Sequence, residues 1–99
     1  MELSIVIPAF EEGGKIAADI SSACRFLQSH DTEGEIIVVD DGSGDNTASA
    51  AGEVEVDNGV SLQVIRYEQH RGKGYAVRSG MAETKGEYVM FADSGCCVP

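Results

Sequence analysis

Short apolar runs rich in β-branched residues alternate along this chain with segments whose apolar residues recur every three or four positions. The apolar runs predict four strands, at Leu3–Ile7, Glu35–Val39, Ser61–Arg66 and Glu87–Ala92. The segments between them predict three helices, at about Lys15–Ser29, Thr47–Glu53 and Gly72–Thr84. Strands that alternate with helices imply right-handed βαβ crossovers, and therefore a parallel sheet in a single α/β domain.

The first helix and the second strand have the clearest patterns. Apolar residues of this helix recur at spacings of four, four and three, at Ile16, Ile20, Cys24 and Leu27. The Ile-Ile-Val-Val run of the second strand is continuous, which is typical of a strand covered on both faces. We therefore expect helices on both sides of the sheet, in three layers.

The charge of the chain limits its partners. A net charge of −10 over 99 residues argues against nucleic acid or an anionic membrane as the main partner. Five of the seven cations nevertheless lie within twenty residues, at Arg66, Arg71, Lys73, Arg78 and Lys85. An acidic body with one basic stretch suits a small phosphorylated ligand.

The cysteines and the hydropathy favour a reducing compartment. Cys24 lies on the apolar face of the first helix and is expected in the core, whereas Cys96 and Cys97 are adjacent and lack the CxxC spacing of zinc sites. No apolar run approaches the ~20 residues of a membrane helix, and no signal peptide is recognisable. We therefore expect a cytoplasmic location.

Polar residues follow three of the predicted strands, at Pro8–Glu12, Asp40–Ser43 and Asp93–Gly95. The carboxyl ends of parallel strands meet at one edge of the sheet, so these groups should share one crevice. Carboxylates there can accept hydrogen bonds from the imide N–H of a base or from ribose hydroxyls. The alternatives are that Asp41–Ser43 is only a capped turn, and that Glu11 and Glu12 are solvated charges at a helix start.

Two further segments are candidates for phosphate and metal binding. His70–Gly74 precedes a helix, where free N–H groups and cations can meet a diphosphate. It is neither a Walker A loop nor a dinucleotide fingerprint, and a histidine such as His70 is more often a loop hydrogen-bonding residue than a ligand. Asp93 suits a partial Mg²⁺ site completed by substrate phosphates, or a turn that ends the strand.

Four motifs carry a resemblance to a known family. Ser4–Glu12 resembles S-V-V-I-P-A-Y-N-E, Ile37–Thr47 resembles V-V-D-D-G-S-x-D-x-T, and Arg71–Gly80 resembles R-G-K-G-x-A-V-R-x-G. Phe91–Asp93 opens a D-x-D motif. Over essentially its whole length the chain resembles the N-terminal half of an inverting nucleotide-sugar glycosyltransferase with the GT-A fold, of the dolichyl-phosphate mannose or glucose synthase type.

The resemblance implies a truncated, Rossmann-like GT-A fold with a parallel four-stranded sheet in the order 3-2-1-4. The nucleotide-binding residues that it implies are Pro8, Ala9, Phe10, Glu12, Asp40, Asp41, Gly72, Lys73 and Asp93. Glu12 would lie near the ribose, Asp40 would read the base together with Asp41, and Lys73 would lie against the diphosphate. Asp93 would lie near the ribose, the diphosphate and a Mg²⁺ or Mn²⁺ ion. Longer relatives of this type can be membrane-associated.

The chain departs from the family pattern at several positions. Glu11 and His70 stand where the family has Asn, and Gly95 replaces the second Asp of D-x-D, which weakens the expected metal binding. The sequence ends at Pro99, before the acceptor-binding half and the general base of such enzymes, so no catalytic residue is assigned.

The resemblance leads to a prediction on association and leaves other functions open. Without further strands, Tyr88–Ala92 would be an apolar sheet edge, which predicts a homodimer. A non-catalytic nucleotide-binding or interaction module is the alternative to a glycosyltransferase donor domain. A receiver-type phosphoacceptor domain is a third interpretation, which the paired Asp40 and Asp41 suit but Pro8–Glu12 does not.

Overall fold

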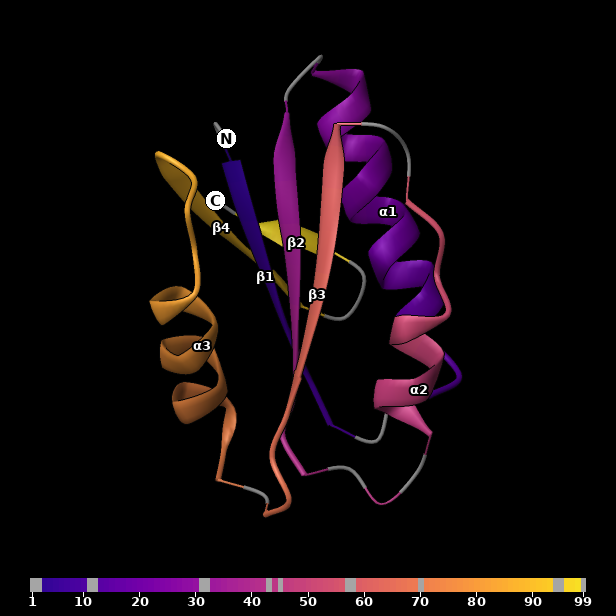
Figure 1. Ribbon diagram of the computed structural model, residues 1–99, viewed down its shortest axis with the longest axis vertical. Helices are drawn as coiled ribbons and strands as arrows, with labels where there is room; N and C mark the ends of the chain where they lie inside the picture. Colours follow the sequence, from indigo (N-terminus) through magenta and orange to yellow (C-terminus); the bar gives the residue numbers. More distant parts are fainter. Residues whose placement is uncertain are drawn as a thin grey trace.

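The computed structural model describes residues 3–10, 13–30, 33–42, 44, 46–56, 59–69, 71–93 and 96–98 (Figure 1). The elements follow one another as β1 (Leu3–Ala9), α1 (Ile16–Ser29), β2 (Gly34–Asp40), α2 (Thr47–Gly52), β3 (Val60–Arg66), α3 (Lys73–Ala82), β4 (Tyr88–Asp93) and β5 (Cys96–Val98). The predicted strands and helices are confirmed, with bounds that differ by one or two residues at most ends. The short β5 was not predicted.

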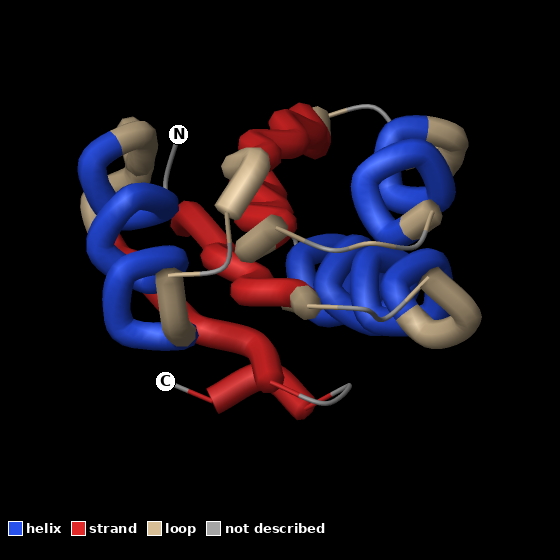
Figure 2. The backbone as a smooth tube through the Cα atoms, turned by 90° about the horizontal axis from the view of Figure 1, so that it is seen from below, coloured by secondary structure: helices blue, strands red, loops and turns tan. Residues whose placement is uncertain are grey.

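The sheet has the order β3-β2-β1-β4-β5, and its first four strands are parallel. The order 3-2-1-4 is therefore confirmed. Helices α1 and α2 cover one face and α3 covers the other, which gives the expected three layers (Figures 1 and 2). The register places Asp40 beside Ala9 on one side and beside Arg66 on the other.

The prediction of an open edge at Tyr88–Ala92 is wrong for its carboxyl-terminal part. β5 runs antiparallel to β4 and pairs Val98 with Phe91, Cys97 with Ala92 and Cys96 with Asp93. A three-residue strand has too few positions to show a hydrophobic period, which is why the sequence pattern missed it. Because β5 occupies part of the edge on which the predicted homodimer depends, the fold does not support that dimer.

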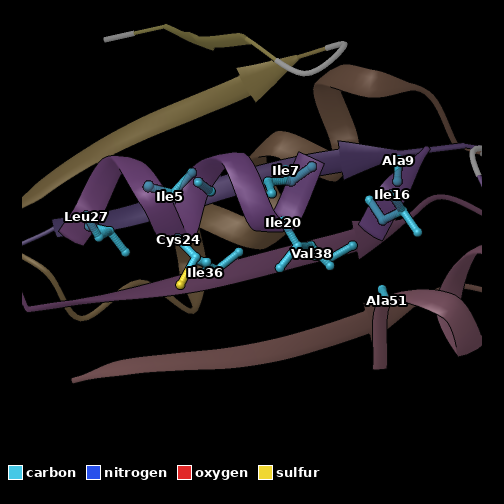
Figure 3. Close-up of a cluster of buried hydrophobic side chains, with 11 residues drawn as sticks. Ile5, Ile7, Ala9, Ile16, Ile20, Cys24, Leu27, Ile36, Val38 and Ala51 are labelled. Carbon is cyan, nitrogen blue, oxygen red and sulfur yellow. The ribbon is translucent and has the colours of Figure 1, made fainter. Parts of the chain in front are cut away.

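Two apolar cores lie on opposite faces of β1 and β2, because successive side chains of a strand point to opposite faces. On one face the stripe of α1 packs against the sheet, as the helical period predicted, and its residues Ile16, Ile20, Cys24 and Leu27 are buried with Ile5, Ile7, Ile36 and Val38 (Figure 3). On the other face α3 covers Val6, Ile37, Val39 and its own Ala76. Both cores are contiguous with the strand ends at which the predicted site lies.

Gly80 allows α3 to lie close to the sheet. A Cβ atom built at Gly80 would be 2.5 Å from Cγ1 of Val6 and 3.1 Å from Cγ2 of Val39. Valine is branched at Cβ and has few alternative rotamers, so the sheet has little freedom to make room. The absence of a side chain at this position therefore determines the distance between α3 and the sheet.

A polar network closes the amino-terminal end of the sheet, opposite the predicted site. The Ser4 hydroxyl and the Lys85 backbone N–H both donate to Oε2 of Glu35, each at 2.6 Å, and the Gly86 N–H donates to Ser4 Oγ at 2.9 Å. Glu35 and Ser4 are buried. The network attaches the turn between α3 and β4 to the first two strands.

In the part of the chain that the structure describes, no helix has the length and apolar character that crossing a membrane requires. The cytoplasmic location stays a prediction.

Candidate functional site

The carboxyl ends of β1, β2 and β3 are joined by hydrogen bonds that continue beyond the regular sheet. The Asp41 N–H donates to the Ala9 carbonyl at 2.8 Å, and the Tyr67 N–H donates to the Asp40 carbonyl at 3.0 Å. These bonds bring the end of the Pro8–Phe10 segment, the Asp40–Asp41 pair and the segment before α3 to one edge of the sheet.

Asp41 is almost completely buried, with 3% of its surface exposed. Its Oδ1 accepts the backbone N–H of Arg71 and its Oδ2 accepts that of Gly72, each at 2.8 Å. Hydrogen bonds from backbone N–H groups to a carboxylate are charge-assisted and stronger than neutral ones. The sequence motifs assigned this carboxylate to the base, and the structure shows in addition that it holds the loop that begins α3.

Gly72 needs the backbone freedom of glycine at this point. Its φ is 97°, in the region that other residues rarely adopt. Its carbonyl accepts the N–H of Ala76 at 3.1 Å, one of the first hydrogen bonds of α3. The chain thus turns at Gly72 from the contact with Asp41 directly into the helix.

Asp40 is fully buried. Its Oδ2 lies 3.6 Å from Nε of Arg66, the residue beside it in the sheet register, and the Arg66 side chain is half exposed. The predicted contact of Asp40 with a base therefore requires a movement of the groups that cover it. Arg66, which the sequence grouped with the phosphate-binding cations, is here the partner of a carboxylate.

A rim of aromatic and charged side chains lies beside the loop, and the sequence interpretation missed its tyrosines. The rings of Tyr67 and Tyr75 meet edge to face with centroids 5.2 Å apart, and the Arg71 guanidinium carbon lies 5.3 Å from the Tyr75 centroid. A cavity of about 370 Å³ is lined by Tyr67, Glu68, Gln69, Arg71 and Tyr75. The only sequence signal was the position of Tyr67 directly after a strand.

The structure describes some of the other predicted site residues fully, some only by their backbone, and some not at all. Phe10 is exposed at the end of β1, Ala9 is buried, and Pro8 is half-buried. Lys73 begins α3 and Asp93 ends β4, but only their backbones belong to the description. Glu12, His70 and Gly95 lie outside the described residues.

The metal site predicted from the sequence rests on Asp93. Within the described ranges, no three His, Cys, Asp or Glu side chains gather as a metal site would require. Only the backbone of Asp93 is described, so the role of its carboxylate as a metal ligand stays a prediction.

Comparison with known proteins decides the family. The model of Glycosyl transferase family 2 matches residues 4–99. The chain belongs to this family. Similar proteins include the dolichyl-phosphate beta-glucosyltransferases of Saccharomyces cerevisiae, 38% identical over 97 residues, and of Mus musculus, 36% identical over 99 residues. These matches cover 93% and 94% of this chain but only 29% and 31% of the relatives.

Two solved structures of other proteins illustrate that the fold is shared. S. aureus TarS 1-349 in complex with UDP-GlcNAc matches with a TM-score of 0.80 and 28% identity, over 96% of this chain and 27% of that one. Glucosyl-3-phosphoglycerate synthase from Mycobacterium tuberculosis, crystallised with Mn²⁺, UDP and glucosyl-3-phosphoglycerate, matches with a TM-score of 0.70 and 32% identity, over 94% and 33% of the two chains. The fold is that of GT-A glycosyltransferases, and the matched region supports a donor-binding domain.

Proposed function

We propose that this chain is the donor-binding part of an inverting glycosyltransferase, which binds a nucleoside-diphosphate sugar for transfer to an acceptor hydroxyl or lipid phosphate. The observation that carries the proposal is the meeting of the β1 end, the Asp40–Asp41 pair and the start of α3 at one sheet edge. Similar chains that bind UDP-GlcNAc and UDP support it. We assign acceptor binding and the general base to the larger part of the relatives that the match does not cover.

In this proposal the nucleoside lies along Pro8, Ala9 and Phe10, with Glu12 near the ribose. The end of β2 recognises the base, because carboxylates accept the ring N–H that uracil and guanine carry beside a carbonyl group. A carboxylate has about four lone-pair sites, so Asp41 can accept a further hydrogen bond beside the two from the loop. Asp40 takes part only when Arg66 and the other groups that cover it move.

The diphosphate lies against Gly72 and Lys73, at the start of α3. The first N–H groups of a helix have no partners within it, and the helix dipole favours negative charge there. Asp93, together with the phosphates, is the residue that would hold a Mg²⁺ or Mn²⁺ ion. Such an ion, when bound, neutralises the charge of a nucleoside diphosphate leaving group.

Titration calorimetry with UDP, GDP and their sugar derivatives, with and without Mn²⁺, tests the proposal. We expect saturable binding of at least one nucleotide, and tighter binding with Mn²⁺. Asp93→Asn should remove the gain in affinity that Mn²⁺ gives. The absence of saturable binding for every nucleotide would refute a donor site on this chain.

A further inference from the structure

Two consecutive residues at the end of β2 hold both ends of the segment between β3 and α3. The Asp40 carbonyl accepts the N–H of Tyr67, and the Asp41 carboxylate accepts the N–H groups of Arg71 and Gly72. We propose that Asp41 is a positioning residue, which sets the geometry of the donor site through this segment in addition to any contact with the base. The effect on donor binding rests on the proposed function, whereas the effect on the loop does not.

The chemistry of the contact requires a carboxylate. Two N–H donors reach two different oxygens at 2.8 Å, in a position from which water is almost excluded. An asparagine side chain offers one oxygen and one NH₂ group, so one backbone N–H would face another donor. A buried donor without an acceptor costs far more than an ordinary hydrogen bond contributes, and the loop would move to avoid it.

The position of the loop determines what lies around it. Four of the five residues that line the cavity belong to this segment, Tyr67, Glu68, Gln69 and Arg71, and the fifth, Tyr75, lies in the first turn of α3. The Arg71 guanidinium carbon lies 5.3 Å from the Tyr75 ring centroid, and the backbone N–H of the same Arg71 donates to Asp41. From outside the cavity, Asp41 therefore fixes the backbone of its Arg71 cation, while the neighbouring Asp40 carbonyl accepts the N–H of Tyr67.

Hydrogen exchange and calorimetry on the full chain test this role with Asp41→Asn. We expect exchange at the amides of Arg71 and Gly72 to rise about tenfold or more, and affinity for UDP or GDP to fall by a similar factor, because each charge-assisted bond accounts for at least that much. Glu55→Gln removes one exposed carboxylate elsewhere and should change neither quantity.

A second variant separates positioning from direct contact. Gly72→Ala keeps the Asp41 carboxylate, and a Cβ at this site meets no atom within 4 Å, so its effect comes from the backbone φ of 97° alone. If Asp41 acts through the loop, Gly72→Ala lowers nucleotide affinity and also speeds exchange at the Arg71 amide. Because Gly72 itself is proposed to lie against the diphosphate, a lower affinity without faster exchange counts against positioning. If affinity is unchanged in Gly72→Ala but falls in Asp41→Asn, Asp41 acts by contact alone and the proposal is wrong.

The remaining outcomes of these experiments also test whether Asp41 positions the loop. Unchanged exchange at both amides in Asp41→Asn would overturn the inference, as would faster exchange with unchanged affinity. If Asp41→Asn does not fold, the unmodified chain serves: its Arg71 and Gly72 amides should exchange more slowly than that of Gln69, and equal rates would overturn the proposal. If the unmodified chain binds no nucleotide, the proposed function fails, and exchange alone decides whether Asp41 holds the loop.

Discussion

The two ends of α3 are attached to the sheet in similar ways. At the carboxyl end of β2, Asp41 binds the backbone that leads into α3, and near the amino end, Glu35 binds the backbone that leaves it. Both carboxylates are buried and both accept two hydrogen bonds. Asp41 holds Arg71, which lines the cavity of about 370 Å³, whereas Ser4 and Lys85, the donors to Glu35, do not line this cavity. Burial of a carboxylate therefore does not by itself indicate a binding site, and its surroundings have to be considered.

The same two carboxylates also align α3 along β2. Glu35, Ile37, Val39 and Asp41 alternate along the chain, so the face of β2 toward α3 has an apolar centre with a carboxylate at each end. Gly80 lets the helix approach Val6 and Val39 in that centre. Burial determines how close α3 lies, and the two carboxylates determine its position along the strand.

Replacing Glu35 should have the largest effect on stability. Glu35→Ala leaves the buried Ser4 hydroxyl and the part-buried Lys85 N–H without their acceptor, which we expect to lower the free energy of unfolding by about 3 kcal/mol. Urea unfolding measures this, with the exposed Glu33→Ala as a control that should change little. A loss below about 0.5 kcal/mol in Glu35→Ala would show that the hydrogen bonds to Glu35 do not attach the carboxyl end of α3 to the sheet.

Gly80→Ala should have the next largest effect. The added methyl group would overlap Val6, and we expect it to destabilise the fold by about 2 kcal/mol although alanine favours helices more than glycine. Gly74→Ala in the same helix meets no atom within 4 Å and should be neutral or stabilising by up to about 1 kcal/mol. Equal effects of the two variants in thermal unfolding would mean that α3 is not closely packed at Gly80.

Arg66→Ala should have the smallest effect on stability. The side chain is half exposed and its Nε lies 3.6 Å from Asp40, so we expect a loss of about 0.5–1 kcal/mol. Because Arg66 is one of the groups over Asp40, its removal should not weaken UDP or GDP binding. Calorimetry that shows a large loss of affinity would instead identify Arg66 as a ligand contact.

Much of this fold was predictable, because its signals are local. The period of α1, the apolar run of β2 and the polar residues after each strand are all visible within short windows. The motif resemblance correctly implied the strand order and the family. The antiparallel β5 was not predictable, because three residues show no period and their pairing with Phe91–Asp93 depends on a reversal of the chain.

The sequence by itself determined the elements from β1 to β4, their succession along the chain and the polar residues at the strand ends, because hydrophobic periods and turn residues act over short distances. Only the tertiary structure decided the different environments of Asp40 and Asp41. Both faces of β2 are apolar, so no alternation in the pattern tells which carboxylate faces which layer. The fold places Asp40 beside Arg66 and Asp41 against the backbone of Arg71 and Gly72, contacts that depend on the register of β3 and on the close approach of α3.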